Sequence, residues 1–200
     1  MLLDAYHIAD TAIDAGIRGE LKKGRKLACA KGCSSCCTTH VTIPVYPLEI
    51  MGIYWYTIHE VKGRDRLALL ASLKTRSPGG ACPFLVDNAC GIHPMRPLAC
   101  RHFNVFDTPC LPGEDPFYTR RKDVFTPNEK EKNRALSKML PFHGIRTRVE
   151  RKAAIRSQTL NGLVKNMQEL DWTKLAHRIE DMTLIINRPI DPEVSNQGNS

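Results

Sequence analysis

The sequence is poor in aromatic residues and has no long apolar run. Phenylalanine, tryptophan and tyrosine make up 6% of its 200 residues, so we expect a largely aliphatic core. No stretch approaches the roughly 18 apolar residues that a membrane-spanning helix requires. The first twenty residues carry Asp4, Asp10, Asp14 and Glu20 and lack the apolar stretch of a signal peptide. We therefore expect a cytoplasmic protein with no membrane partner.

Several signatures of catalysis are missing as well. The chain has no glycine-rich nucleotide loop, no nucleophile elbow of the G-x-S-x-G type, no H-E-x-x-H pair and no paired-carboxylate signature. These absences favour a binding protein over an enzyme, and whether the chain catalyses a reaction stays open.

The hydrophobic pattern predicts a mainly α fold with a small irregular β element, in which helices flank a metal-stapled, cysteine-rich core. Helical spacing covers residues 3–22, 47–60, 64–74, 145–167 and 172–186. Thr126 as N-cap and Pro127 at the first position predict a further helix that runs to about Leu140. Residues 84–86 and 91–93 are expected to pair as a hairpin around Asp87 and Asn88.

These patterns divide the chain into four predicted segments. They are an N-terminal helix (1–26), a cysteine-cluster metal-binding domain (27–112), a basic helical C-terminal region (113–190) and a frayed tail (191–200).

Positive charge is concentrated in one block. The formal net charge is +8, and residues 118–156, with twelve Lys or Arg against four acidic residues, account for all of it. We expect this block to dock an unknown protein partner, with nucleic acid as the less favoured ligand. The simpler alternative is a solvated helix surface. No aromatic residues interleave its last helix, which argues against base stacking there.

The eight cysteines carry the strongest chemical signal. They fall into two groups, and all are candidate metal ligands: Cys29, Cys33, Cys36 and Cys37, then Cys82, Cys90, Cys100 and Cys110. Two cysteines separated by two residues can turn both sulfurs to one ion, as in zinc knuckles and iron–sulfur loops. Without a signal peptide, four disulfides are a weaker interpretation. A buried, inert thiol is a further alternative, most easily at Cys110.

The adjacent pair Cys36–Cys37 bears on the number of sites. Neighbouring side chains of an extended chain point to opposite sides, so one ion rarely takes both. Two four-thiolate sites, or one polynuclear cluster with thiols to spare, both fit the spacing. His40, His93 and His102 are possible substitute ligands, and His102, close after Cys100, is the strongest of them.

In these residues the chain resembles the CxxCxxCC zinc- or iron-chelating proteins, also called YkgJ-like cysteine-cluster proteins. The resemblance covers roughly residues 27–111. The matching positions are Cys33, Cys36 and Cys37, residues 41–43, Glu49, residues 82–85 and 90–93, Arg96, Pro97 and residues 100–103. Two departures are the three-residue gap between Cys29 and Cys33, where the family usually has two, and His93 in place of a tyrosine.

The resemblance implies a bound iron–sulfur cluster or zinc, and the Cys82–Pro83 pair favours the cluster because Cys-Pro closes ferredoxin loops. The centre would be structural or electron-carrying. A distant similarity to flagellin lysine N-methylases implies an alternative, an iron–sulfur enzyme that modifies a protein side chain. A nucleic-acid-associated metal protein is a third possibility. Arg96 and Arg101 are expected either to neutralise a thiolate-bound metal or to pair with Glu49 or Asp87.

Overall fold

The computed structural model describes residues 1–30, 32–76 and 79–186. Helices dominate the described chain, and its sheets are small two-stranded pairs, so the predicted mainly α fold with a small β element is confirmed. No helix in this part is both long and apolar enough to cross a membrane. The predicted frayed tail, 191–200, lies outside the described residues.

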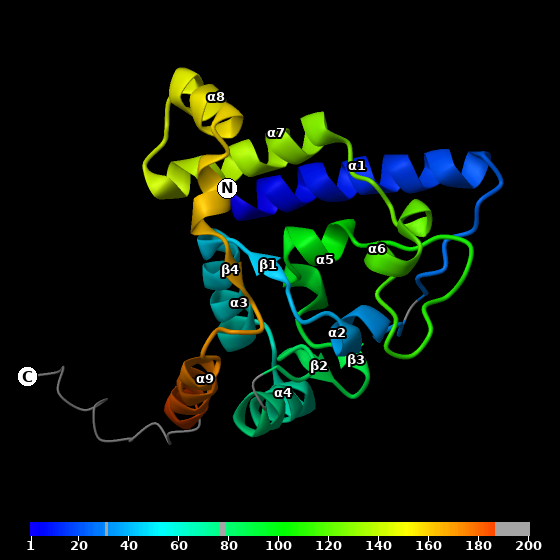
Figure 1. Cartoon of the computed structure of the whole chain (residues 1–200). Helices are drawn as coiled ribbons and strands as arrows, with labels where there is room; N and C mark the ends of the chain where they lie inside the picture. Colours follow the sequence, from blue (N-terminus) through cyan, green and yellow to red (C-terminus); the bar gives the residue numbers. More distant parts are fainter. Residues whose placement is uncertain (31, 77–78, 187–200) are drawn as a thin grey trace, which may run out of the picture.

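Figure 1 shows the arrangement of these elements. The α-helices are α1 (Leu2–Lys22), α2 (Ser35–Thr39), α3 (Pro47–His59), α4 (Gly63–Thr75), α5 (Leu98–His102), α6 (Pro116–Thr119), α7 (Glu129–Met139), α8 (Arg148–Arg156) and α9 (Thr173–Ile186). Short 3-10 helices are η1 (His93–Met95), η2 (Arg121–Asp123), η3 (Leu140–His143) and η4 (Thr159–Leu163). The strands are β1 (Pro44–Val45), β2 (Leu85–Val86), β3 (Ala89–Cys90) and β4 (Lys165–Asn166).

The long helices follow the sequence pattern closely, and one helix start differs. Helices α1, α3, α4 and α9 match their predicted spans to within one residue at each end. Helix α7 begins two residues later than predicted, because Asn128 rather than Thr126 is its N-cap. The Asn128 side chain accepts hydrogen bonds from the backbone N–H groups of Lys130 (3.0 Å) and Glu131 (3.2 Å).

The helix predicted over 145–167 is wrong in its second half. Helix α8 ends at Arg156, Gln158 takes a left-handed backbone conformation with φ of 53°, and η4 follows. The chain then extends as β4 and pairs antiparallel with β1, Asn166 opposite Pro44. The Asn166 side chain accepts from Ile43 N–H at 3.1 Å and donates to Val41 O at 3.1 Å. These contacts across the sequence outweigh the local helical pattern.

The predicted hairpin forms, but its strands pair in a different register and its turn is shorter. Strand β2 pairs with Ala89–Cys90, not with 91–93, so Asp87 and Asn88 alone make the turn. Both turn residues have positive φ, 47° and 60°, as a two-residue turn of type I′ requires. This tight turn holds Cys90 directly opposite Leu85.

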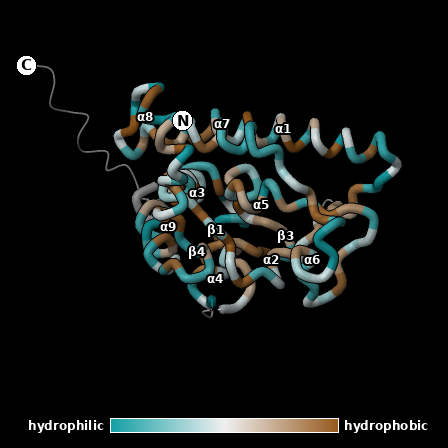
Figure 2. The backbone as a smooth tube through the Cα atoms, turned by 45° about the horizontal axis from the view of Figure 1, so that its top comes forward, coloured by the Kyte–Doolittle hydropathy of each residue, from teal (hydrophilic) through white to brown (hydrophobic). Residues whose placement is uncertain are grey.

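Two apolar clusters make up the core of the described residues. The first lies between α1, α5, α7 and α8 and includes Phe106 and Leu140. The second lies between β1, α3, α4, the hairpin and α9, where Trp172 packs against Phe84 with ring centres 4.7 Å apart. In Figure 2 hydrophobic and hydrophilic residues alternate along α1 and α7, as expected of helices that cover a core on one side.

A buried carboxylate joins helices α3 and α5. The Glu49 side chain is fully buried and accepts hydrogen bonds from Tyr46 N–H (2.9 Å) and Leu98 N–H (2.7 Å). These donors lie at the N-termini of α3 and α5, where backbone N–H groups lack helical partners. Glu49 therefore satisfies both helix starts with one side chain.

We expect Glu49→Ala to lower the free energy of unfolding by about 2–4 kcal/mol, because it leaves two buried N–H groups without an acceptor. Urea denaturation followed by circular dichroism measures the change. Glu60→Ala is the control, since Glu60 lies exposed at the other end of α3 and should change stability by about 0.5 kcal/mol or less. Equal losses in the two variants would show that the shared cap contributes nothing.

Candidate metal centre

Thiols from both cysteine groups of the sequence meet beside the second apolar cluster. Cys37 lies on α2, Cys82 precedes the hairpin, Cys90 lies in β3 and Cys100 lies on α5. All four pack in that cluster, and Cys82 is 7% exposed. The fold thus brings together members of both cysteine groups that the sequence keeps at least 45 residues apart.

A backbone contact fixes the two groups to each other. The N–H of Cys82 donates to the carbonyl of Cys37 at 2.7 Å. Nearby, the Ser34 hydroxyl donates to the side-chain oxygen of Asn88 at 2.5 Å, so α2 is also bonded to the hairpin turn. The Cys37 thiol lies near the thiols of Cys36 and Cys82.

The remaining thiols lie outside the second apolar cluster, and Cys36 on α2 is partly buried. Cys29 precedes α2 in a segment bridged to Phe106 through Leu27, and its Sγ accepts from Val105 N–H at 3.3 Å. Cys33 is exposed, and Cys110 is partly buried in the loop before α6.

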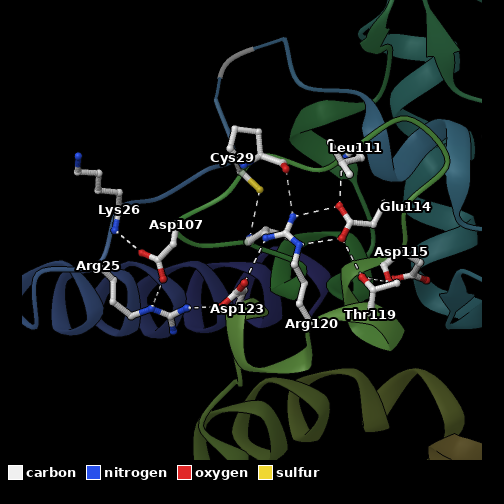
Figure 3. Close-up of polar contacts among 12 residues, drawn as sticks. Arg25, Lys26, Cys29, Asp107, Leu111, Glu114, Asp115, Thr119, Arg120 and Asp123 are labelled. Atoms are coloured by element: carbon white, nitrogen blue, oxygen red, sulfur yellow. Dashed lines mark hydrogen bonds and ion pairs between the residues drawn. The ribbon is translucent and has the colours of Figure 1, made fainter.

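A network of ion pairs holds the segments that carry these outer thiols, as Figure 3 shows. Arg120 forms two hydrogen bonds to Glu114, at 2.8 and 3.3 Å, and a third to Asp123 at 3.3 Å. It also donates to Pro109 O at 3.2 Å, next to Cys110. The sequence analysis placed Arg120 only in the basic block and missed this role, although its partners Glu114 and Asp123 lie within six residues of it.

Arg25 continues the network toward Cys29. Its guanidinium bonds to Asp107 (2.9 Å), Glu20 (3.1 Å) and Asp123 (3.3 Å) and lies over the Phe106 ring. Asp107 has a φ of 68°, and its carboxylate also accepts from Lys26 N–H at 3.0 Å. Asp123 is the carboxylate that the two arginines share.

The thiols are poor acids in this setting. Burial raises the pKa of Cys29, Cys90, Cys100 and Cys110. A hydrogen bond from Cys36 lowers the pKa of Cys37, but the bond to Cys82 and burial outweigh it and raise the value to about 12. A metal ion must therefore displace protons from these sulfurs, and its binding weakens in acid.

Of the two arginines near the cysteines, Arg96 lies among the sulfurs and Arg101 does not. The charge of Arg96 lowers the pKa of Cys29 and Cys90 against the effect of burial, and the buried Arg96 Nε has no hydrogen-bond partner. Arg101 instead pairs with Asp10 at 2.6 Å and stacks on Tyr6, which joins α5 to α1. The expected ion pair with Glu49 or Asp87 is wrong for both arginines, and neutralisation of the thiols is supported for Arg96 alone.

The three histidines that were possible substitute ligands do not lie among the sulfurs. His102 lies against α1 and α7 in a small cavity that Ala9 and Lys132 also line. The ring of His40 packs on Phe103, and its Nε2 lies 3.4 Å from a carboxylate oxygen of Asp115. His93 is exposed. The candidate donors of this centre are therefore sulfurs.

The donor set fits a thiolate-bound zinc ion or iron–sulfur cluster, since sulfur ligands are what both prefer. In the described residues, no three histidine, cysteine, aspartate or glutamate side chains are gathered closely enough to hold an ion. Binding would thus have to draw neighbouring thiols together. Which cysteines are ligands stays a prediction.

Comparison with known proteins agrees with this donor set. A family model described as "CxxCxxCC: Putative zinc- or iron-chelating domain" matches residues 28–134, more than half of the chain and all eight cysteines. The chain belongs to this CxxCxxCC family. No curated protein and no solved structure matches it.

The ion-pair network predicts a pH dependence of stability. Hydrogen bonds from Arg120, then from Leu111 N–H, lower the pKa of Glu114 from 4.5 to about 2. Because the pKa is lower in the folded state, this stabilisation is complete above about pH 4.5 and is lost as the pH falls toward 2. Glu114→Gln should therefore be less stable than the wild type at neutral pH, and the difference should shrink with acid.

Urea denaturation at a series of pH values measures that difference. Glu129→Gln is the matched control, because Glu129 forms only an exposed pair with Lys132 on α7. A stability difference for Glu114→Gln that does not change with pH would contradict the role assigned to its charge.

Proposed function

We propose that this CxxCxxCC protein binds an iron–sulfur cluster or zinc through its thiols, and that the centre is structural or electron-carrying. The main support is the convergence of Cys37, Cys82, Cys90 and Cys100 on one apolar cluster. Neutral thiols are tolerated there, but four cysteines from three segments exceed what packing alone requires. A narrower assignment to the YkgJ-like proteins is part of this proposal.

An iron–sulfur cluster is the favoured occupant. The neighbouring donors are sulfurs, and a thiolate-bound cluster carries negative charge that the guanidinium of Arg96 would offset. A cation beside the sulfurs tends to raise the reduction potential of such a cluster. Zinc in a four-thiolate site uses the same ligands and is the alternative.

The metal would also stabilise the fold. Its ligands lie on α2, the hairpin and α5, which are short elements with few backbone hydrogen bonds of their own. A structural zinc ion contributes about 10–16 kcal/mol of apparent binding free energy in small peptides, so even a fraction of that would hold these elements together.

Elemental analysis of protein purified without air tests the metal. We expect iron with acid-labile sulfide and a broad visible absorption band, all of which should fall sharply in Cys82→Ser. Ser72→Ala is the control, since Ser72 bonds to the carbonyls of Pro83 and Leu85 beside the site but brings no thiol. Stoichiometric zinc without a visible band would identify the alternative metal. Wild-type protein that holds neither metal, even after reconstitution, would contradict the function.

We further propose that α8 docks an acidic protein partner. Helix α8 and the residues just before it carry five basic side chains that form no ion pair in the described structure, namely Arg146, Arg148, Arg151, Lys152 and Arg156. The only acidic residue of α8, Glu150, caps its own helix start through Thr147 N–H. Val149 is 80% exposed among these charges. Arg120, by contrast, pairs with Glu114 and Asp123, whereas these five side chains gather their unpaired charge on and just before one helix.

Binding to immobilised polyglutamate and to a DNA duplex tests this surface. We expect polyglutamate binding that weakens with salt and is largely lost in Arg148→Ala/Lys152→Ala. The matched control is Lys132→Ala/Arg134→Ala on α7, whose side chains already pair with Glu129 and Glu131. Tighter, strongly salt-dependent binding to DNA would favour a nucleic-acid ligand instead.

The enzyme alternative finds less support in the structure. A cavity of about 480 Å³ lies between α1 and the 122–131 segment, with Arg25 and Phe106 in its wall. No cysteine lines this cavity. A modifying enzyme would need its substrate beside the thiols, so the cavity does not argue for one.

A further inference from the structure

We propose that the cavity between α1 and the 122–131 segment is a binding site for a small monocarboxylate with an apolar body. The cavity has a volume of about 480 Å³, and no cysteine lines it. Small-molecule sites commonly have volumes of about 300–1,000 Å³ and combine apolar walls with a few polar groups. Binding here does not depend on a metal at the thiols.

The residue pattern of α1 opens the cavity. In the first half of α1, larger side chains such as Tyr6 and Ile13 are buried in the first apolar cluster. Toward its second half, α1 presents Ala12, Ala15 and Gly16, which are too small to fill the space beside the helix, and all three line the cavity. Figure 1 shows that α1 runs on past the start of α7. The cavity thus follows from a change of side-chain size along one helix.

Two phenylalanines form a fixed apolar wall. A Cβ atom at Gly16 would lie 2.6 Å from the Phe125 ring, so this ring reaches α1 only because position 16 has no side chain. Phe106 is fully buried. Backbone bonds hold both residues, from Phe125 N–H to Asn104 O and from Phe106 N–H to Asp123 O, each at 2.8 Å. The fold itself therefore fixes the wall, and a ligand need not order it.

The charged side chains of the cavity favour one negative charge on the ligand. Glu20 pairs with Arg25 at 3.1 Å, and Glu131 pairs within α7 at 3.3 Å. Lys122 is the charged residue of the cavity that forms no ion pair among the described residues. Its charge acts on Asp107 more weakly than the charge of Arg25 does. One anionic group can therefore meet Lys122, while a second would face Glu20 and Glu131.

Neutral donors on the same segment favour a carboxylate as that anionic group. Asn128 uses its side-chain oxygen to cap α7, which leaves its amide NH₂ group for a ligand. The Thr126 hydroxyl also lines the cavity. Both groups and the Lys122 ammonium donate hydrogen bonds, and an ionised carboxylate is purely an acceptor. The apolar body of the ligand would then lie against Val124 and Phe125.

Isothermal titration calorimetry of the full chain with 2-naphthoate tests the site, with 2-naphthalenemethanol as the neutral analogue. We expect one site per chain that binds 2-naphthoate at least about fivefold more tightly than the alcohol, because charge-assisted hydrogen bonds are stronger than neutral ones. Lys122→Met should weaken 2-naphthoate binding by a similar factor. Lys130→Met is the matched control and should bind as the wild type does, since Lys130 is exposed on α7 and does not line the cavity.

A second pair of variants tests the space rather than the charge. Ala12→Leu places a larger side chain in the cavity wall and should abolish the binding of both compounds. Ala71→Leu makes the same change at an exposed position of α4 and should leave binding unchanged. The amide NMR signals of Gly16 and Val124 should shift when 2-naphthoate is added to the wild type, and this readout stands even if Ala12→Leu fails to fold.

A wild-type chain that binds no 2-naphthoate, or that binds the alcohol equally well, would overturn the proposal. Equal binding by Lys122→Met and the wild type would do the same. Loss of binding in Arg148→Ala/Lys152→Ala would place the carboxylate on α8 and would also overturn the site. In each case metal binding by the thiols would stand, because it is measured separately.

Discussion

The arrangement of the thiols depends on the buried carboxylate of Glu49. Helix α3 follows strand β1, and α5 carries Cys100, so the bonds of Glu49 to Tyr46 N–H and Leu98 N–H set how these two segments meet. Burial raises its pKa to about 7, and the two backbone bonds, Tyr6 and Arg101 act against that rise. Tyr6 belongs to α1, so this polar group lies where α1, α3 and α5 meet beside the first apolar cluster.

The arginines around the thiols differ in whether a carboxylate balances their charge. Arg101, Arg25 and Arg120 are each bonded to carboxylates, so their charge is already balanced within the protein. Arg96 has no carboxylate partner in the described residues, and its Nε is buried without a hydrogen bond. A partly buried cation of this kind is stabilised when a negative group faces it. Thiols that become thiolates on binding a metal would supply that group, which explains why an arginine is tolerated here.

The sequence predicts well what depends on local periodicity. Helices α1, α3, α4 and α9 have clear apolar spacing and end near the expected residues, and the family resemblance rests on cysteines that the family model matches. Predictions failed where distant contacts decide the outcome. Strand β4 forms because Asn166 bonds to Val41 and Ile43, more than 120 residues away, and Arg101 turns to Asp10 on a helix that lies outside the cysteine region.

The grouping of the thiols could not be predicted for a similar reason. Spacing shows that Cys36 and Cys37 diverge, but not which sulfurs each one meets, since that depends on how α2 lies against the hairpin. The bonds that fix this, Cys82 N–H to Cys37 O and Ser34 to Asn88, join residues 45 or more positions apart. The type of donor was therefore predictable, whereas which thiols lie near one another follows from tertiary structure.

The part of the chain that matches the family does not contain everything that shapes the thiol region. The second apolar cluster is completed by Met167, Trp172, Leu175, Ala176 and Ile179, all of which follow the matched residues 28–134. Trp172 packs on Phe84 and donates its indole N–H to Met167 O at 2.8 Å, while Met167 N–H donates to Ile43 O at 2.8 Å. At the other end, α1 supplies Tyr6 and Asp10, which bond to Met95 and Arg101 on either side of Cys100. The cysteine motif thus supplies the candidate metal ligands. The flanking helices supply the apolar side chains that pack beside these ligands and the polar side chains that bond to the segment around Cys100.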